Sequence, residues 1–315
     1  MASMRILVLD TNHPVLVQTL TKSGFEVVED YQSSLDEVLD RVHEFQGLVV
    51  RSRFNIDQAF INKAKNLKFI ARVGAGMDSI DVEYARSQGI VCLHSPQGNA
   101  VAVGEHCVGM LLSLFNKLFS ANMQVKKGIW NREENRGEEL AGKTVGIIGY
   151  GNMGNAFAQR LSGFQVEVIF YDILSGLENQ YAGEVTLEEL FEKADVLSLH
   201  TPLTPLTRGL INKDFLSKFS KPIYVINAAR GKSLVIKDLL WGLDSGKVLG
   251  ACLDVLEVEE SQFQNDFKDP ENKDLQALLQ SDKIIFSPHI AGWTHQSKYK
   301  LAYFISQQII DKFGV

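Results

Sequence analysis

The chain has 315 residues, of which 45% are hydrophobic and 22% charged, a composition typical of a soluble globular protein with room for two domains. Its formal net charge of −6 provides no basic field for nucleic acid or for an anionic membrane surface, so neither is expected as a partner. Cys92, Cys107 and Cys252 are an odd number of cysteines in apolar contexts, which argues against a disulfide framework and for a reducing compartment. Without a bilayer-length apolar stretch or a signal peptide, the chain is expected in the cytoplasm.

The first hundred residues alternate apolar strands with helices. Continuous apolar runs are typical of strands buried in a parallel sheet, and they occur at residues 4–10, 47–51 and 67–73, with shorter strands expected at 25–28 and 90–93. Between them the pattern predicts helices at 14–23, 34–42, 56–65 and 82–88. This stretch is too long to be a prelude to another domain, so it predicts an open, mostly parallel α/β domain of its own.

Residues 101–126 are apolar around most of a helical circumference. Glu105, His106 and Lys117 argue against a membrane-spanning helix. A long helix buried between domains or at a subunit interface fits the pattern better. The polar, turn-rich residues 128–140 are expected to form a loop.

Residues 143–172 carry the most specific pattern. A β-branched strand at 144–148 runs into Gly149-Tyr-Gly151-Asn-Met-Gly154, and a helix at 155–164 and a second strand at 166–171 follow. The first glycine allows a tight turn, the second lets the backbone approach a pyrophosphate, and the third lets helix and strand pack closely. The helix N-terminus directs N–H groups and partial positive charge at the phosphates. This combination predicts a dinucleotide-binding βαβ unit; the alternative is a glycine turn in another kind of βαβ unit.

The second strand of this unit ends at Asp172, eighteen residues past Gly154. A carboxylate there suits the hydroxyls of an adenosine ribose and would repel a 2′-phosphate. The residues that follow, Ile173-Leu174-Ser175, include no Arg or Lys to offset that charge. We therefore predict NAD rather than NADP as the cofactor.

The alternation of strands and helices continues to the end of the chain. It predicts strands at 196–200, 223–227, 249–253 and 283–287, and helices at 187–193, 213–218, 236–245 and 294–313. The acidic, unpatterned residues 257–272 are expected to form a surface loop. Because the last helix follows the last strand directly, we expect it to return and pack on the first domain.

Three ionisable residues stand just beyond successive predicted strands, where ligands bind in open α/β sheets: Arg230, Glu259 and His289. An Arg can grip a carboxylate with two parallel hydrogen bonds. A His can pass a proton near neutral pH, and a Glu bonded to its other ring nitrogen fixes the tautomer and favours the charged form. Beside a nicotinamide, these groups suit hydride transfer between a 2-hydroxy acid and its 2-keto acid.

Each of these residues also has a structural alternative. Arg230 alone is compatible with a surface ion pair, Glu259 with a solvated loop charge, and His289 with a structural histidine at a strand end. Their joint placement on one dinucleotide fold favours the catalytic interpretation.

The chain resembles the D-isomer-specific 2-hydroxyacid dehydrogenase family nearly from end to end. The matching stretches follow the family's order: IARVGAGMDSIDVEYA, NAVAVGEH, GKTVGIIGYGNMG, LHTPLT, INAARG, GACLDVLE and SPHIAGWT. The resemblance implies a Rossmann-type doubly wound parallel sheet at residues 102–289, inserted into a flavodoxin-like α/β substrate domain made of residues 1–101 and 290–315. It also implies an active site in the cleft and a homodimer built through the cofactor domains.

The resemblance also assigns catalytic roles. The Arg of the family's N-x-x-R-G falls on Arg230, which would bind the substrate carboxylate and carbonyl, and the acid/base His falls on His289. The family's Glu, five residues past the Asp of L-D-V, falls on Glu259. Two departures stand out, since the family usually has Pro where Glu260 follows, and the segment from Glu259 to His289 is longer than usual. Glu257 and Glu260 are therefore the alternatives for this role.

The remaining roles that the resemblance implies concern cofactor and substrate. In addition to Gly149, Gly151, Gly154 and Asp172, the expected cofactor residues are Asn152, Met153, His200, Thr201, Pro202, Ala228, Ala229, Asp254, His289 and Gly292. The backbone N–H groups of Gly74, Ala75 and Gly76 would bind the substrate carboxylate. Arg230 would orient the keto acid, and protonated His289 would give its proton to the oxygen as the hydride reaches C2.

The substrate prediction depends on Arg51-Ser52-Arg53, which follows a strand of the first domain. Two guanidiniums there suit a second anionic group such as a phosphate. The segment is similar to the R-S-x-T stretch of D-3-phosphoglycerate dehydrogenases, although Phe54 departs from it; Arg53 is alternatively an ordinary surface charge. We predict 3-phosphoglycerate oxidation, as in serine biosynthesis, by a short form without a C-terminal regulatory domain. The alternatives are glyoxylate or hydroxypyruvate reduction and D-lactate formation.

A non-enzymatic alternative is an NAD(H)-sensing binding protein, like the transcriptional corepressors of this family. The presence of Arg230, Glu259 and His289 disfavours it. No Cys/His spacing suggests a metal site. His106 and His295 are expected to be structural.

Overall fold

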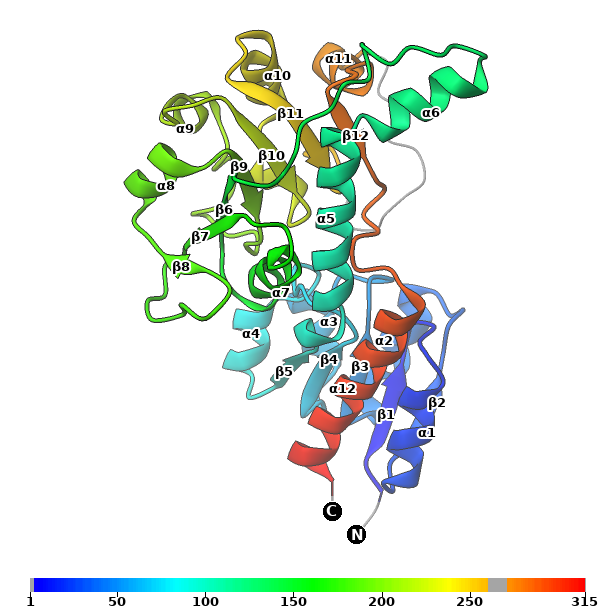
Figure 1. The fold of residues 1–315 in the computed structure, drawn as a ribbon. Coiled ribbons are helices and arrows are strands. Elements are labelled where there is room, and N and C mark those ends of the chain that lie inside the picture. The colour runs from blue at the N-terminus through cyan, green and yellow to red at the C-terminus, as the bar shows by residue number, and fades with distance from the viewer. Residues whose placement is uncertain (1–2, 260–270, 315) are drawn as a thin grey trace. The chain divides into compact units, whose positions relative to one another are not determined.

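The computed structural model describes residues 3–259 and 271–314. The described chain divides into two compact units, one made of residues up to 99 and from 293 onward, the other of residues 100–259 and 271–292 (Figure 1). The sequence predicts these domain boundaries between residues 101 and 102 and between residues 289 and 290. Among the described residues, no helix combines the length and apolarity needed to cross a membrane.

The described strands of the first unit form a five-stranded parallel sheet in the order β2-β1-β3-β4-β5. These strands are β1 (Arg5–Val8), β2 (Glu26–Glu29), β3 (Gly47–Val50), β4 (Phe69–Arg72) and β5 (Val91–His94). The accompanying helices are α1 (Val15–Lys22), α2 (Leu35–Arg41), α3 (Gln58–Lys63), α4 (Val82–Ser87), α12 (His295–Phe313) and the 3₁₀ turns η1 (Val42–Glu44) and η2 (Pro96–Gly98).

Both faces of this sheet are buried, which explains its continuous apolar strands. Because successive side chains point to opposite faces, Leu7 packs in one core cluster with residues of α2 and α3, while Ile6 packs in another with α1 and α12. Leu301 and Ile305 of α12 belong to that second cluster. The expectation that the last helix returns to the first domain is therefore confirmed.

The described strands of the second unit form a seven-stranded parallel sheet in the order β12-β11-β10-β9-β6-β7-β8. Its strands are β6 (Thr144–Ile148), β7 (Glu167–Tyr171), β8 (Gly183–Glu184), β9 (Val196–Leu199), β10 (Ile223–Asn227), β11 (Val248–Leu253) and β12 (Ile284–Phe286). The order reverses at β6, which pairs with β7 on one side and β9 on the other. Ligands bind at such a reversal, outside the carboxyl ends of the strands.

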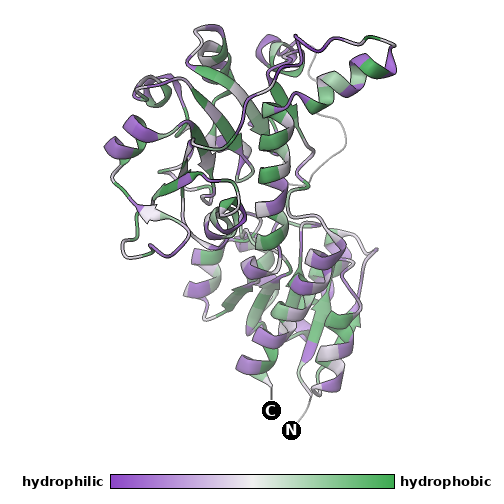
Figure 2. Cartoon of the chain, in the orientation of Figure 1, coloured by the Kyte–Doolittle hydropathy of each residue, from purple (hydrophilic) through white to green (hydrophobic). Residues whose placement is uncertain are grey.

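The helices of the second unit are α5 (Ala100–Phe115), α6 (Leu118–Lys126), α7 (Asn152–Leu161), α8 (Leu187–Lys193), α9 (Lys213–Ser217), α10 (Ile236–Asp244), α11 (Lys273–Leu279) and the 3₁₀ turn η3 (Gly231–Ser233). In Figure 2 the strands of both sheets are largely green, whereas most helices carry both colours, as expected for helices that cover buried sheets. The doubly wound α/β prediction is confirmed. β8 and α11 were not expected from the sequence, and most of the expected 257–272 loop lies outside the described residues.

The prediction of one continuous helix at 101–126 is wrong, because the structure has two helices there, α5 and α6. Lys117 between them has φ 50°, in the left-handed region. The backbone N–H of Glu138 donates to the Phe115 carbonyl oxygen (3.0 Å), which takes the acceptor that a continuing helix would use. A side chain at Gly137 would collide with that same oxygen. A tertiary contact of the following loop therefore ends α5.

Candidate active site

The glycines of the fingerprint lie at the junction of β6 and α7, and their steric environments differ. Gly149 has φ +90°, and a Cβ there would lie 2.8–2.9 Å from Thr201 and the His200 carbonyl. A Cβ at Gly154 would collide with the Gly149 carbonyl oxygen, whereas nothing lies within 4 Å of the Cβ position at Gly151. The backbone is thus open at the second glycine and close-packed at the other two, as a pyrophosphate cradle requires. Helix α7 begins right after this opening, at Asn152.

Asp172 lies directly after β7, beside the fingerprint loop. Its carboxylate accepts hydrogen bonds from the backbone N–H of Tyr150 (2.7 Å) and of Leu174 (3.0 Å). The Tyr150 ring stacks on Phe170 with centroids 3.9 Å apart. Asp172 therefore stabilises the loop and also places a negative charge next to it.

The segment after β9 lies on the other side of β6. The side chain of His200 is buried, its Nε2 is 2.9 Å from the Ser198 hydroxyl, and burial lowers its pKa to about 3. His200 is therefore a neutral structural side chain, and only its backbone lines the fingerprint turn. The buried Thr201 Oγ1 has no hydrogen-bond partner among the described residues. Because Thr201 lies next to Gly149 of the fingerprint, such an unsatisfied hydroxyl fits a bound dinucleotide.

Arg230 follows β10 in a short, tightly constrained turn. The buried Asn227 side chain donates to the Arg230 carbonyl (3.0 Å) and accepts from the Ala229 N–H (3.1 Å). The Arg230 guanidinium donates to the Ala229 carbonyl (2.7 Å). A side chain at Gly231 would collide with the Leu256 carbonyl oxygen, so the turn packs against the segment that follows β11.

Glu259 and His289 come together in the second unit, as the sequence suggested. His289 Nδ1 is hydrogen-bonded to Glu259 Oε1. A histidine whose Nδ1 is bonded to a carboxylate can exchange a proton through Nε2. Of the two alternatives, Glu257 accepts the Ile236 N–H at the start of α10 (2.9 Å), and Glu260 lies outside the described residues.

Backbone hydrogen bonds connect the ends of three neighbouring strands. The Asp254 N–H donates to the Asn227 carbonyl (3.0 Å), and the His289 N–H donates to the Asp254 carbonyl (2.7 Å). Arg230, Asp254 and His289 therefore follow β10, β11 and β12 along one edge of the sheet. The other predicted cofactor residues also follow strands of this edge or the fingerprint: Met153 in α7, Pro202 after β9, Ala228 and Ala229 after β10, and Gly292 after β12.

Arg51 and Arg53 follow β3 in the first unit but have different environments. The Arg53 guanidinium donates to the carbonyls of Leu9 (3.1 Å), Asp30 (2.8 Å) and Ser33. Because those bonds occupy its guanidinium, Arg53 has a structural role, and we do not propose it as a substrate ligand. The Arg51 guanidinium instead lies over the Trp293 ring and makes no hydrogen bond or ion pair within residues 3–259 and 271–314. Burial lowers the pKa of Arg51.

The Gly74–Gly76 loop follows β4 at the same edge of the first sheet. The Gly74 N–H donates to the Arg72 carbonyl (2.9 Å), whereas the N–H groups of Ala75 and Gly76 donate to no group that the structure describes. The Arg72 guanidinium packs against Gly74, and its Nε donates to the Arg51 carbonyl (3.2 Å). Arg72 was not among the candidate residues expected from the sequence, although it ends β4 much as Arg51 follows β3, a position typical of residues that line a ligand site.

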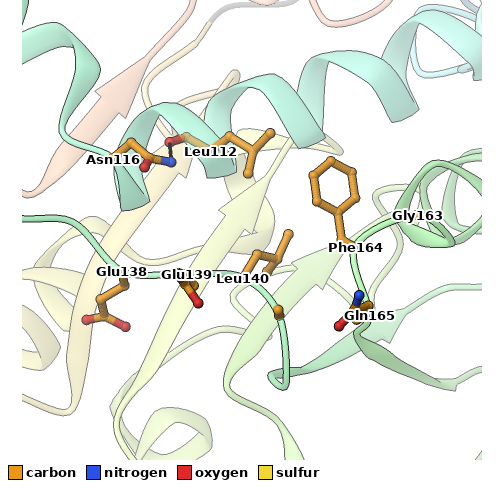
Figure 3. A pocket seen from close by; sticks show the side chains of 9 residues that line it. Leu112, Asn116, Glu138, Glu139, Leu140, Gly163, Phe164 and Gln165 are labelled. Carbon is orange, nitrogen blue, oxygen red and sulfur yellow. Dashed lines mark hydrogen bonds between the residues drawn. The ribbon is translucent and has the colours of Figure 1, made fainter.

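The second unit has a cavity of about 360 Å³ that is not lined by any of the candidate active-site residues described above. Its lining includes Leu140 and Gln165, which precede β6 and β7, so it lies toward the amino ends of those strands (Figure 3). Among the described residues, no group of three or more His, Cys, Asp or Glu side chains could hold a metal ion.

The comparison with known proteins agrees with this geometry. The family model for the D-isomer specific 2-hydroxyacid dehydrogenase NAD binding domain matches residues 108–291. The chain belongs to the D-isomer-specific 2-hydroxyacid dehydrogenase family. The predictions of this family and of NAD as its cofactor are thereby confirmed.

Among its relatives, the chain is 34% identical to a hydroxypyruvate reductase of Thermotoga maritima, over 100% of both chains. It is 35% identical to a D-3-phosphoglycerate dehydrogenase of Bacillus subtilis, over 98% of this chain and 56% of the relative. The chain thus spans about half the length of the phosphoglycerate dehydrogenases that it matches. A D-lactate dehydrogenase structure from Aquifex aeolicus, complexed with NAD and lactic acid, has a TM-score of 0.83 and 26% identity, covering 98% of this chain and 95% of that chain.

Proposed function

We propose that this protein is an NAD-dependent oxidoreductase that transfers a hydride between nicotinamide and a D-2-hydroxy acid or its 2-keto acid. The observation that carries the proposal is the hydrogen bond between His289 and Glu259 at the carboxyl edge of a dinucleotide-binding sheet. A histidine with its Nδ1 held by a carboxylate can exchange a proton through Nε2. The same pair disfavours the NAD(H)-sensing alternative, since binding alone requires no proton donor.

Each polar residue of the second unit has a role in this proposal. NAD(H), when bound, supplies or accepts the hydride. In the reductive direction, His289 donates its proton to the carbonyl oxygen, and Glu259 stabilises the imidazolium from which the proton leaves. Arg230 pairs with the substrate carboxylate and helps to hold the negative charge that develops on the oxygen. Oxidation reverses each transfer.

We propose a substrate with a second anionic group, 3-phosphoglycerate first. Arg51 supports this, because a partly desolvated guanidinium without a hydrogen-bond partner among the described residues suits an anionic ligand. The N–H groups of Ala75 and Gly76 would donate hydrogen bonds to the substrate carboxylate. Phosphoglycerate oxidation would place the enzyme in serine biosynthesis. The second candidate is hydroxypyruvate or glyoxylate reduction, favoured by the match to the Thermotoga maritima reductase over the full length of both chains. D-Lactate formation is the third.

The test is a spectrophotometric panel of D-2-hydroxy acids and 2-keto acids assayed with NAD(H). We expect NADH production with at least one D-2-hydroxy acid and none with its L-isomer. His289→Ala should reduce turnover far more than it weakens NADH affinity, because the imidazole is the proposed proton donor and is only one of many residues expected to contact the cofactor. Equal losses in turnover and affinity would contradict the acid/base role, and an inactive panel with tight NADH binding would favour the sensor.

We also propose a homodimer in which α6 contributes to the interface. This helix has no buried residue, and it exposes Leu118, Phe119, Met123 and Val125 by more than half of their surface. Figure 1 shows it extending away from the seven-stranded sheet of its own unit. A cluster of exposed apolar side chains of this kind is typical of a protein–protein contact, and a second copy of the chain is the partner that the family resemblance implies.

We propose the cytoplasm as the location of the protein. Cys92, Cys107 and Cys252 are free, and burial raises the pKa of the Cys107 and Cys252 thiols, which keeps them unreactive. Three free thiols agree with a reducing compartment.

A further inference from the structure

A chain of side-chain hydrogen bonds runs from α5 to the peptide segment that carries His289. His106 Nε2 lies 2.8 Å from the Ser287 hydroxyl oxygen, and that hydroxyl lies 2.5 Å from Asp254 Oδ1. All three residues belong to the second unit. Nothing in the proposed chemistry uses His106 or Ser287, although 181 positions separate them in the chain.

The directions of these bonds follow from the number of available protons. An ionised carboxylate only accepts hydrogen bonds, so the single hydroxyl proton of Ser287 is donated to Asp254. The Ser287 oxygen must then accept from His106, which carries a proton on Nε2. The order of donation is therefore His106 to Ser287 to Asp254.

Asp254 in turn holds the backbone on both sides of His289. Its Oδ1 accepts the N–H of Ile290 and its Oδ2 accepts the N–H of Ala291, both at 2.9 Å. Its carbonyl oxygen accepts the N–H of His289 at 2.7 Å. The Asp254 side chain is almost completely buried, so water does not compete for these bonds.

The conformation of His289 explains why such support is needed. Its φ is 55°, in the left-handed region that residues other than glycine rarely adopt. A conformation of this kind persists only where the surrounding contacts over-determine it. The three hydrogen bonds that Asp254 accepts from residues 289–291 provide that constraint, and Ser287 fixes the orientation of the carboxylate that accepts two of them.

We propose that His106 and Ser287 are positioning residues for the reaction: they orient the Asp254 carboxylate, which holds the His289 backbone so that the imidazole reaches the substrate oxygen. The inference rests on the proposed acid/base role of His289. Neither residue touches the reacting atoms. A relaxed His289 backbone would misplace the imidazole, and a misplacement of about 1 Å costs on the order of 100-fold in rate.

The experiment compares variants that delete a proton donor with variants that keep one. Ser287→Ala and His106→Leu remove the donors, whereas Ser287→Thr keeps the hydroxyl and His106→Gln keeps an N–H near the Nε2 position. The matched control is Ser198→Ala, which deletes a buried hydroxyl that is likewise hydrogen-bonded to a histidine of the same unit, His200. Single-turnover hydride transfer, the NADH dissociation constant and the thermal melting temperature are measured for each.

We expect Ser287→Ala and His106→Leu to slow hydride transfer about 10- to 100-fold with NADH affinity within about threefold of wild type. Ser287→Thr and His106→Gln should recover most of the rate. Ser198→Ala should lower the melting temperature comparably but keep the rate. Donor-deleting variants as fast as wild type, or no slower than Ser198→Ala, would overturn the inference.

These variants, together with His289→Ala, distinguish a failure of this inference from a failure of the proposed function. If His289→Ala is inactive while Ser287→Ala is fully active, only the positioning role is wrong. If His289→Ala remains active, the acid/base assignment itself is wrong. The imidazole ¹⁵N signals of His289, assigned by their loss in His289→Ala, provide a readout without turnover: they should move in Ser287→Ala and stay near the wild-type position in Ser287→Thr. Unmoved signals in Ser287→Ala would also overturn the inference.

Discussion

The guanidinium of Arg51 lies over the indole ring of Trp293, with its carbon 4.5 Å from the ring centroid. The two residues are far apart in the chain, at the end of β3 and just before α12, yet both belong to the first unit. The indole is 66% exposed, so it orients the cation from one side without pairing its charge. The stack thus orients the guanidinium that we propose as a ligand for the second anionic group of the substrate.

The first prediction uses this stack to test the substrate class. Arg51→Ala should lower kcat/KM for 3-phosphoglycerate about 10- to 100-fold, since a charge-assisted hydrogen bond contributes about 1.5–3 kcal/mol. Activity on glyoxylate should change by less than about threefold. Trp293→Leu should lower kcat/KM for 3-phosphoglycerate about tenfold and again leave glyoxylate activity nearly unchanged. Trp293→Phe keeps an aromatic ring and should recover most of that loss. Equal effects on both substrates would remove the argument for a second anionic group.

The second prediction concerns the carboxylate beside His289. Glu259→Gln should lower kcat about 10- to 100-fold with a smaller change in KM, because the amide cannot stabilise the imidazolium. Glu257→Gln is the matched control, since Glu257 holds the first turn of α10. That variant should keep wild-type turnover. A larger loss of turnover in Glu257→Gln than in Glu259→Gln would exchange the two roles.

The third prediction concerns cofactor choice. Asp172→Asn keeps an acceptor for the Tyr150 N–H but removes the negative charge, so the fingerprint loop should stay intact. The ratio of kcat/KM for NAD over NADP should fall at least about tenfold, mostly through better use of NADP. Steady-state kinetics with both cofactors provides the ratio. An unchanged ratio would show that Asp172 only supports the loop.

The fourth prediction follows from the buried imidazole of His200, whose pKa falls from 6.5 to about 3. Because the unfolded chain binds this proton more readily, the contribution of neutral His200 to stability is complete above pH 6.5 and is lost as the pH falls toward 3. The loss is about 1.4 kcal/mol per pH unit within that window. Urea unfolding at pH 7, 6 and 5 should show a shallower pH slope for His200→Gln than for wild type. His43→Gln, at an exposed position, should keep the wild-type slope.

The fifth prediction tests α6 as an interface. Phe119→Glu and Met123→Glu place charges on a helix without buried residues, so the fold of each subunit should be retained. A dimer that uses this surface should dissociate, and sedimentation would show a monomer with an unchanged circular dichroism spectrum. Lys127→Glu, just past the same helix, is the control for added charge. Dimers that persist in both apolar-to-Glu variants would locate the interface elsewhere.

Much of the fold was predictable because its determinants are local. The apolar runs that became β1, β3, β4, β6 and β10 are buried on both faces, and such strands are recognisable from composition alone. Gly149, Gly151 and Gly154 were interpretable because their spacing between a strand and a helix is itself a local sequence pattern. The two-residue β8 is too short for a periodic pattern, and α11 directly follows the unpatterned stretch that was expected to be a loop. The break at Lys117 depends on the loop residue Glu138, which donates to the Phe115 carbonyl oxygen.

The sequence by itself determined the dinucleotide fold, the family and the set of candidate catalytic residues. Only the tertiary structure decided which of two neighbouring side chains does what: Arg53 binds backbone carbonyls while Arg51 stacks on Trp293, and Glu257 holds α10 while Glu259 meets His289. Residues one or two positions apart share composition and context, so no local pattern separates them. Their environments differ because the partners come from distant segments, as His106 does for Ser287.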